Sequence, residues 1–177
     1  MRQRRAVFLD RDGVLNELVE RDGGRFSPRR FDQFKLFPWC VGALTDLSNS
    51  GLFLVVVTNQ PDIARGLLEL AELSAMHELL HASTPVNKIY TCPHETRDNC
   101  LCRKPQPGLL LNAAQEFHLD LSQSWIIGDR LSDLEAGRRA GTRLAHVATG
   151  QDPTPIDTDV LSFVDLRQAA DHIISVI

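Results

Sequence analysis

The sequence lacks several features that would place it in a special class of proteins. None of its apolar runs approaches the roughly 18 residues that a membrane-spanning helix requires, so we expect no membrane partner. The first apolar stretch, residues 6–9, ends at Asp10 and is too short for a secretory signal, which predicts a cytoplasmic protein. The net charge of −4 and the lack of interleaved aromatic and basic residues predict no nucleic-acid partner.

Cysteine is scarce and unevenly distributed, since three of the four cysteines lie within residues 92–102. A cytoplasmic chain of this length does not need disulfides, which favours metal binding in this stretch. Three thiols and one imidazole form the donor set of a closed zinc site with no position left for a catalytic water. We therefore predict a structural Zn²⁺ that fixes this loop, with the ligands Cys92, His94, Cys100 and Cys102. Free thiols beside a capping histidine are the alternative, and Cys40 is predicted to be a buried core thiol.

The alternation of short apolar runs with helix-period segments is typical of an α/β protein. It predicts a mostly parallel sheet with helices on both faces, a Rossmann-like three-layer sandwich. Strands are predicted at residues 6–9, 52–58, 88–92, 124–128 and 143–149, with an edge strand at 162–165. Helices are predicted at residues 39–50, 69–83, 107–118, 132–140 and 166–175. The length and the lack of a linker predict one domain over residues 1–177 without a large cap, and residues 150–159 are expected to form a surface connection.

Polar side chains follow four of the predicted strands, where ligands bind in an open parallel sheet. Asp10 and Asp12 come directly after the first strand, and as unpaired carboxylates they would repel each other. Mg²⁺ relieves such repulsion and prefers a few carboxylates, phosphate oxygens and water, so Asp10 and Asp129 are predicted to bind it beside a phosphoryl group. Thr58 and Lys104 follow the second and third strands. A plain turn or helix cap is the alternative for the two aspartates.

Four short motifs stand in a fixed order along the chain: "DRDG" at 10–13, "TNQ" at 58–60, "RKP" at 103–105 and "GDRLSD" at 128–133. Together they resemble the motifs of the haloacid dehalogenase superfamily of aspartate-nucleophile phosphatases, and the resemblance spans residues 6 to about 150. It implies that Asp10 attacks phosphorus and that Asp12 is the general acid and base. It also implies phosphoryl binding by Thr58 and Lys104, support from Asp133, and a magnesium set made of Asp10, Asp12 and Asp129.

The stretches "DRDGVLN", "TNQPDIARG" and "CRKPQPG" are similar to the small capless branch of this superfamily, which includes heptose-1,7-bisphosphate and histidinol-phosphate phosphatases. The resemblance implies Mg²⁺-dependent removal of the 7-phosphate from D-glycero-D-manno-heptose-1,7-bisphosphate through an aspartyl-phosphate, in the synthesis of nucleotide-activated heptose for glycans such as lipopolysaccharide. We expect a monomer. The implied contacts to this phosphorylated sugar are Asn59, Gln60, Arg103, Arg130 and Arg21.

Three alternatives stay open at this point. A histidinol-phosphate phosphatase, or another small phosphomonoester phosphatase, would use the same chemistry. A polynucleotide end phosphatase is disfavoured by the net charge. A non-catalytic, zinc-stabilised phosphate-binding module would not require the complete set of acidic, hydroxyl and lysine side chains.

Two loops bear on the substrate. This chain has Pro61 and Asp62 where the family commonly has Ser-Gly, which predicts a stiffer and more acidic substrate loop. The arginine-rich residues 25–31 are interpreted as a solvated loop, with a border of the active site as the alternative.

Overall fold

The computed structural model describes residues 3–149, 152–153 and 157–177. Its main sheet has six strands in the order β5-β4-β1-β6-β7-β8, and every neighbouring pair is parallel. The strands are β1 (Ala6–Leu9), β4 (Phe53–Asn59), β5 (Lys88–Cys92), β6 (Trp125–Gly128), β7 (Arg143–Val147) and β8 (Val160–Phe163). This confirms the predicted parallel α/β sheet.

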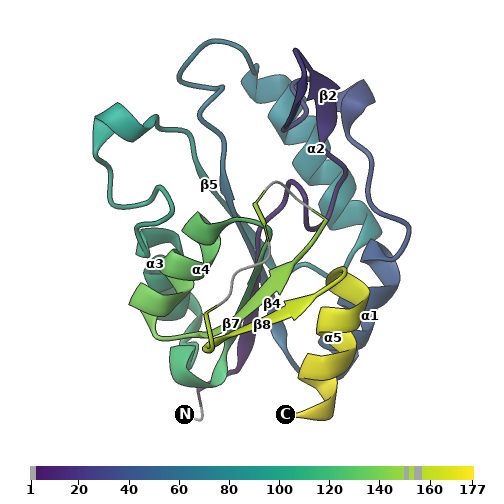
Figure 1. Cartoon of the computed structure of the whole chain (residues 1–177), viewed down its shortest axis with the longest axis vertical. Helices are drawn as coiled ribbons and strands as arrows, with labels where there is room; N and C mark the ends of the chain where they lie inside the picture. Colours follow the sequence, from purple (N-terminus) through teal and green to yellow (C-terminus); the bar gives the residue numbers. More distant parts are fainter. Residues whose placement is uncertain (1–2, 150–151, 154–156) are drawn as a thin grey trace.

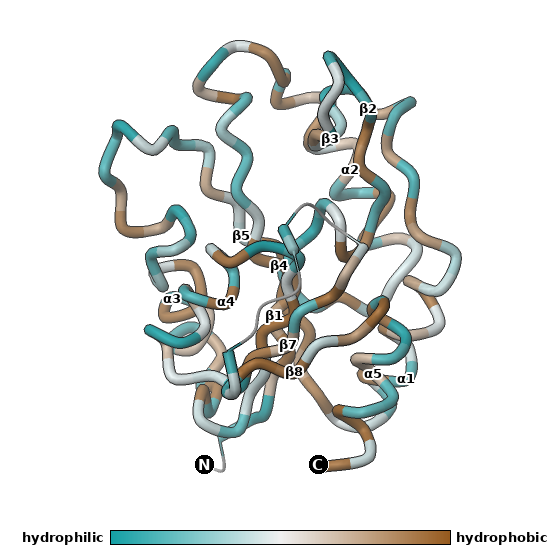
Figure 2. The backbone as a smooth tube through the Cα atoms, in the orientation of Figure 1, coloured by the Kyte–Doolittle hydropathy of each residue, from teal (hydrophilic) through white to brown (hydrophobic). Residues whose placement is uncertain are grey.

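The central strands form the middle layer because their residues are apolar on both faces. Every residue of β1 and β6 is buried, as expected for strands covered on both sides. The helices are α1 (Cys40–Asn49), α2 (Leu70–Ser83), α3 (Gly108–Phe117), α4 (Leu131–Ala140) and α5 (Leu166–Ser175). Helices α1 and α5 pack on one face of the sheet, and α3 and α4 pack on the other (Figure 1). Brown apolar segments accordingly concentrate in the central strands (Figure 2).

One supersecondary element was missed from the sequence. An antiparallel hairpin, β2 (Val19–Arg21) and β3 (Gly24–Phe26), follows β1. Its turn residues Asp22 and Gly23 both have positive φ, at 50° and 75°. An Asp-Gly pair favours this turn, but strands of three residues are too short to show a period.

The remaining differences concern boundaries and short turns. Strand β8 begins two residues earlier than predicted, and β7 ends at Val147 rather than at residue 149. Short 3₁₀ turns lie at Phe31–Gln33, Thr96–Asp98 and Leu121–Gln123. Half of the predicted surface connection at 150–159 falls outside the described residues.

Strand order reverses beside β1, because the chain runs from β1 outward to β5 and then returns to β6 on the other side. Ligand sites in open α/β sheets form at such a reversal, outside the carboxyl ends of the strands. The loops after β4 and β5 and the β2–β3 hairpin gather at this end of the sheet, opposite the two chain termini (Figure 1). Within the described residues, no insertion forms a large cap over it, and no helix is long and apolar enough to span a membrane.

Candidate active site

Lys104 forms the centre of the site. Its Nζ lies 2.7 Å from Asp10 Oδ1 and 2.7 Å from Asp133 Oδ1, and it donates a third hydrogen bond to the Val57 carbonyl at 2.7 Å. The side chain is 2% exposed. Burial alone would lower the pKa of Lys104, but the carboxylates of Asp10 and Asp133 raise it, so the ammonium stays charged.

Asp133 reaches this lysine from the first turn of α4. Its carboxylate also accepts a hydrogen bond from the Arg130 backbone amide at 3.1 Å, which caps the helix. Gly128, at the end of β6, makes room for it, because a Cβ at that position would lie 2.3 Å from the Asp133 Cβ. The strand end and the helix start therefore hold the aspartate in one place.

Three carboxylates converge beside the lysine. Ligand oxygens of Asp10, Asp129 and Asp133 lie within 4.8 Å of one another, and all three residues are buried. Burial raises the pKa of Asp10 to about 6 despite the nearby Lys104, and Asp133 and Asp12 add to the increase. Three acids beside one lysine leave an excess of negative charge in a buried place, which suits a hard divalent cation with oxygen ligands.

Asp12 lies apart from this acidic group, and its carboxylate accepts hydrogen bonds from three side chains. Arg11 Nη2 is 2.9 Å from Oδ1, Asn16 Nδ2 is 2.9 Å from Oδ1, and Gln60 Nε2 is 2.7 Å from Oδ2. Burial would raise the pKa of Asp12, but the Arg11 guanidinium and these hydrogen bonds hold it below its ordinary value. The structure thus groups Asp133, rather than the Asp12 side chain, with Asp10 and Asp129, and the role of Asp12 as a metal ligand stays a prediction.

The "TNQ" residues at the end of β4 contact the catalytic candidates. Asn59 Oδ1 accepts a hydrogen bond from the Lys104 amide, and Asn59 Nδ2 donates to the Lys104 carbonyl, both at 3.1 Å. Gln60 Nε2 donates to Thr58 Oγ1 at 2.9 Å as well as to Asp12. Asn59 and Gln60 therefore hold other site residues in place, and their predicted contact with the substrate stays untested.

A cavity of about 720 Å³ opens above these groups. Asp10, Asp12, Asn59, Gln60, Lys104 and Asp133 line it, together with the predicted substrate contacts Arg103 and Arg130. Arg21 does not line this cavity but a neighbouring depression, because it lies in the β2–β3 hairpin with its guanidinium over the Phe26 ring. Thr58 and Asp129 do not line the cavity and are buried, with exposed fractions of 1% and 0%.

The arginine-rich stretch borders the cavity, which agrees with the alternative interpretation of residues 25–31. Phe26, Ser27 and Arg29 line the cavity wall. Arg29 Nε donates to Asp62 at 2.6 Å, and Arg65 donates to the other oxygen of Asp62 at 3.1 Å. The expectation of a more acidic substrate loop is therefore wrong, because two guanidinium groups neutralise the Asp62 charge.

A chain of ion pairs joins this rim to the cysteine-containing loop. Arg65 Nε lies 2.6 Å from Glu95 Oε1, and Glu95 follows His94 directly. Arg29 was anticipated only through the alternative interpretation of residues 25–31, and Arg65 and Glu95 were not predicted as site residues. Arg65 and Glu95 lie in loops that are far apart in the sequence, and no local pattern distinguishes them from other surface charges.

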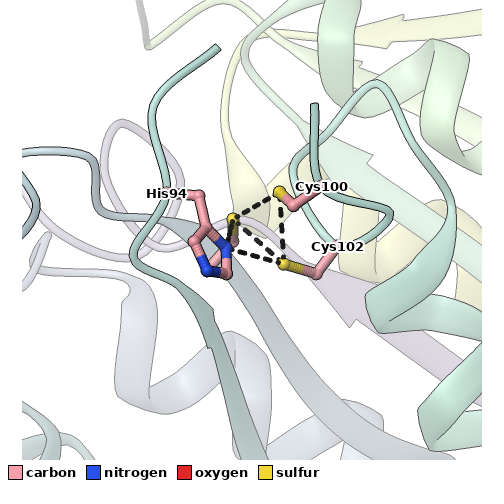
Figure 3. Close-up of side chains that lie close together, drawn as sticks. His94, Cys100 and Cys102 are labelled. Atoms are coloured by element: carbon pink, nitrogen blue, oxygen red, sulfur yellow. Dashed lines mark hydrogen bonds between the residues drawn. The ribbon is translucent and has the colours of Figure 1, made fainter. Parts of the chain in front are cut away.

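The four predicted zinc ligands lie together. The side chains of His94, Cys100 and Cys102 point toward one another (Figure 3). Cys102 Sγ is 3.2 Å from Cys92 Sγ, 3.5 Å from Cys100 Sγ and 3.3 Å from His94 Nδ1. Four soft donors at such spacing fit a tetrahedral metal ion. Cys40 is separate and buried in α1, where burial raises the pKa of its thiol to about 12.

The cysteine-containing loop packs closely on the start of α3. The Gly108 amide donates to the Leu101 carbonyl at 3.1 Å, and a Cβ on Gly108 would lie 2.2 Å from that oxygen. Arg103 Nη1 also donates to the His94 carbonyl at 3.1 Å. The loop is thereby tied to the segment that carries Lys104.

Comparisons with known proteins agree with this geometry. The HAD-hydrolase-like family model matches residues 101–173. The chain is 36% identical over 176 residues to the D-glycero-beta-D-manno-heptose-1,7-bisphosphate 7-phosphatase of Pseudomonas aeruginosa, covering 94% of this chain and 96% of that protein. It is 37% identical over 183 residues to the protein of the same name from Escherichia coli K12, covering 93% and 92%.

A solved structure shows the same fold. The D,D-heptose 1,7-bisphosphate phosphatase of B. bronchiseptica, crystallised with magnesium and phosphate, superposes with a TM-score of 0.85 at 31% identity, covering 97% of this chain and 98% of that one. The chain therefore belongs to the haloacid dehalogenase-like hydrolases, in the family of the heptose-1,7-bisphosphate phosphatases.

Proposed function

We propose that this chain removes the 7-phosphate from D-glycero-β-D-manno-heptose-1,7-bisphosphate as a magnesium-dependent phosphatase. The observation that carries the proposal is the buried Lys104, held between Asp10 and Asp133 at the base of an open cavity. The names of the relatives favour this substrate over histidinol phosphate.

Asp10 is the proposed nucleophile. A carboxylate attacks a phosphate dianion only when positive charge offsets their repulsion, and Lys104 supplies one such charge at 2.7 Å from Asp10. The Lys104 charge also favours the ionised form of Asp10, the form that attacks. Attack forms an Asp10–phosphorus bond while the bond from phosphorus to the leaving oxygen breaks.

Asp12 is the proposed general acid and base. It would give a proton to the leaving heptose oxygen and later take one from the water that attacks the aspartyl-phosphate, which restores the starting state. Asp12 lines the same cavity as Asp10. Thr58 and Lys104 are proposed to bind the phosphoryl oxygens.

Asp10 and Asp129 are the proposed magnesium ligands, together with a main-chain oxygen of Asp12, because hydrogen bonds occupy the Asp12 side chain. When bound, Mg²⁺ would neutralise charge on the phosphoryl oxygens. The convergent buried carboxylates support a divalent site, and the B. bronchiseptica structure contains magnesium and phosphate. Asp133 is proposed to support the site by holding Lys104.

Zn²⁺ is proposed as a structural ion bound by the three cysteines and His94, because their donor atoms already lie together. It would hold the loop that precedes Arg103 and Lys104. Arg103 and Arg130 are proposed to bind the sugar bisphosphate, since guanidinium groups suit phosphate and both line the cavity.

The biological setting is part of the proposal. We also propose that the chain is a cytoplasmic, monomeric, single-domain enzyme of nucleotide-activated heptose synthesis. The relatives' names support the heptose substrate, and the open cavity suits a small sugar phosphate.

Phosphorus NMR of the reaction tests which ester is cleaved. With Mg²⁺ and the β-heptose bisphosphate, we expect the 7-phosphate signal to disappear as inorganic phosphate forms, while the anomeric 1-phosphate signal persists. A sample with excess chelator is the control and should show no turnover. Loss of the 1-phosphate first would contradict the proposal.

A further inference from the structure

A buried guanidinium lies directly behind Asp12. Arg11 is 0% exposed, and its Nε and Nη2 donate to Asp12 Oδ1 at 3.1 and 2.9 Å. Nη2 also lies 3.0 Å from Oδ2. The Phe34 ring covers the guanidinium, with its centroid 5.4 Å from Cζ. Because a buried charge is costly unless it is paired, Arg11 depends on Asp12 and on an acceptor for its remaining edge.

His77 provides that acceptor from helix α2. Its Nε2 lies 3.2 Å from Arg11 Nη1. A guanidinium has donors only, so Nε2 must be the unprotonated nitrogen, with the ring proton on Nδ1. Burial and, to a smaller extent, the Arg11 charge lower the pKa of His77 to about 4, which is consistent with a neutral ring.

We propose that His77 and Arg11 are positioning residues that fix the Asp12 carboxylate for proton transfer to the leaving oxygen. This inference rests on the proposed function, because it needs Asp12 to be the general acid. His77 accepts a hydrogen bond from Nη1 on one edge of the Arg11 guanidinium. The opposite edge donates to Asp12 through Nε and Nη2.

The hydrogen bonds on Asp12 show how the Arg11 guanidinium orients this carboxylate. Oδ1 accepts hydrogen bonds from two Arg11 nitrogens and from Asn16, whereas Oδ2 accepts hydrogen bonds from Gln60 and from a single Arg11 nitrogen. Oδ1 is therefore the more fully occupied oxygen, and Oδ2 is the one better able to carry the proton. Because the Arg11 guanidinium keeps Asp12 ionised in the free protein, Oδ2 must take up a proton from solvent when the anionic substrate binds. The leaving oxygen takes that proton when its bond to phosphorus breaks, and Asp12 is again a carboxylate. A rotated guanidinium would turn this oxygen away from the substrate.

Helix α2 fixes the position of His77. Leu73 and Met76, on the same helix, pack with Phe34 and Leu68 in a small apolar cluster of their own. Phe34 thus belongs to this cluster and also covers the Arg11 guanidinium. An apolar side chain at position 77 would leave Arg11 Nη1 without the one side-chain acceptor that the described residues give it.

The test compares His77→Leu, which removes the acceptor, with His77→Gln, which keeps one. The matched control is His81→Leu, one turn further along α2 and exposed. For each protein, kcat/KM is measured with heptose bisphosphate, whose leaving oxygen needs a proton, and with 4-nitrophenyl phosphate, whose leaving group does not.

We expect His77→Leu to lose about tenfold to a hundredfold in kcat/KM with the heptose ester and less than about threefold with the nitrophenyl ester. His77→Gln should recover most of the loss, and His81→Leu should behave as the wild type. Thermal unfolding of each variant verifies that it is folded.

An equal loss with both esters, or no loss with either, would overturn the positioning role. If His77→Leu does not fold, the His77→Gln variant provides the test. The positioning role is also overturned if His77→Gln loses as much kcat/KM with both esters as a variant that lacks the Asp12 carboxylate. Wild-type protein that hydrolyses neither ester would instead refute the proposed function, so the two failures are distinguishable.

Discussion

Replacement of Asp10 by asparagine should abolish turnover and leave the protein folded. The amide has nearly the shape of the carboxylate but cannot attack phosphorus, so we expect kcat to fall by about 10⁴-fold or more. The fold should persist because Lys104 keeps its bonds to Asp133 and to the Val57 carbonyl. Steady-state phosphate release and thermal unfolding measure the two effects.

Asp46→Asn is the matched control for that experiment. Asp46 lies on α1, half-exposed and paired with Arg167, and it does not line the cavity. The same chemical change there should leave kcat unchanged. Asp10→Asn protein that retained more than about a hundredth of the wild-type kcat would refute the assignment of Asp10 as nucleophile.

Protein purified without chelator should contain about one zinc per chain, and Cys100→Ser should lower both zinc content and activity. The serine hydroxyl is a poor zinc ligand, and the freed loop no longer fixes the segment that carries Arg103 and Lys104. Because small displacements of a phosphate-binding group are costly, we expect kcat/KM to fall by about a hundredfold. Elemental analysis and the heptose phosphatase assay measure the two quantities.

Cys40→Ala provides the cysteine control, because Cys40 is buried in α1 and lies outside the metal-binding group. It should keep both the zinc and the activity. A zinc content well below one per chain in the wild type, or an active Cys100→Ser enzyme without zinc, would refute the structural zinc site.

Much of the fold and site could be predicted because the signals are local. The buried strands are short apolar runs whose ends meet at one edge of the sheet, so the sequence predicts that Asp10, Lys104 and Asp133 lie close together, as they do. The zinc ligands are close in the sequence and of a distinctive type. The type and spacing of these zinc ligands indicate a metal site, whereas the catalytic roles of the aspartates and Lys104 are implied by the resemblance to the family.

Contacts between distant segments were not predictable in this way. No local pattern in the sequence indicates that Arg11 is completely buried, and its contact with His77 joins residues that are 66 positions apart. Asp62 was expected to add negative charge to the rim, but Arg29 and Arg65 come from other loops to neutralise it. Tertiary partners decide the charge and exposure of such residues.

The measurement that tests the central claim most directly is kcat/KM for phosphate release with Mg²⁺ across a small set of substrates. The set contains both anomers of D-glycero-D-manno-heptose-1,7-bisphosphate, histidinol phosphate, fructose-1,6-bisphosphate and a 3′-phosphorylated oligonucleotide. We expect the β-heptose bisphosphate to exceed every other substrate by at least about a hundredfold, which is ~2.7 kcal/mol of transition-state discrimination. Low, similar values across the set, or a clear preference for another ester, would contradict the heptose assignment.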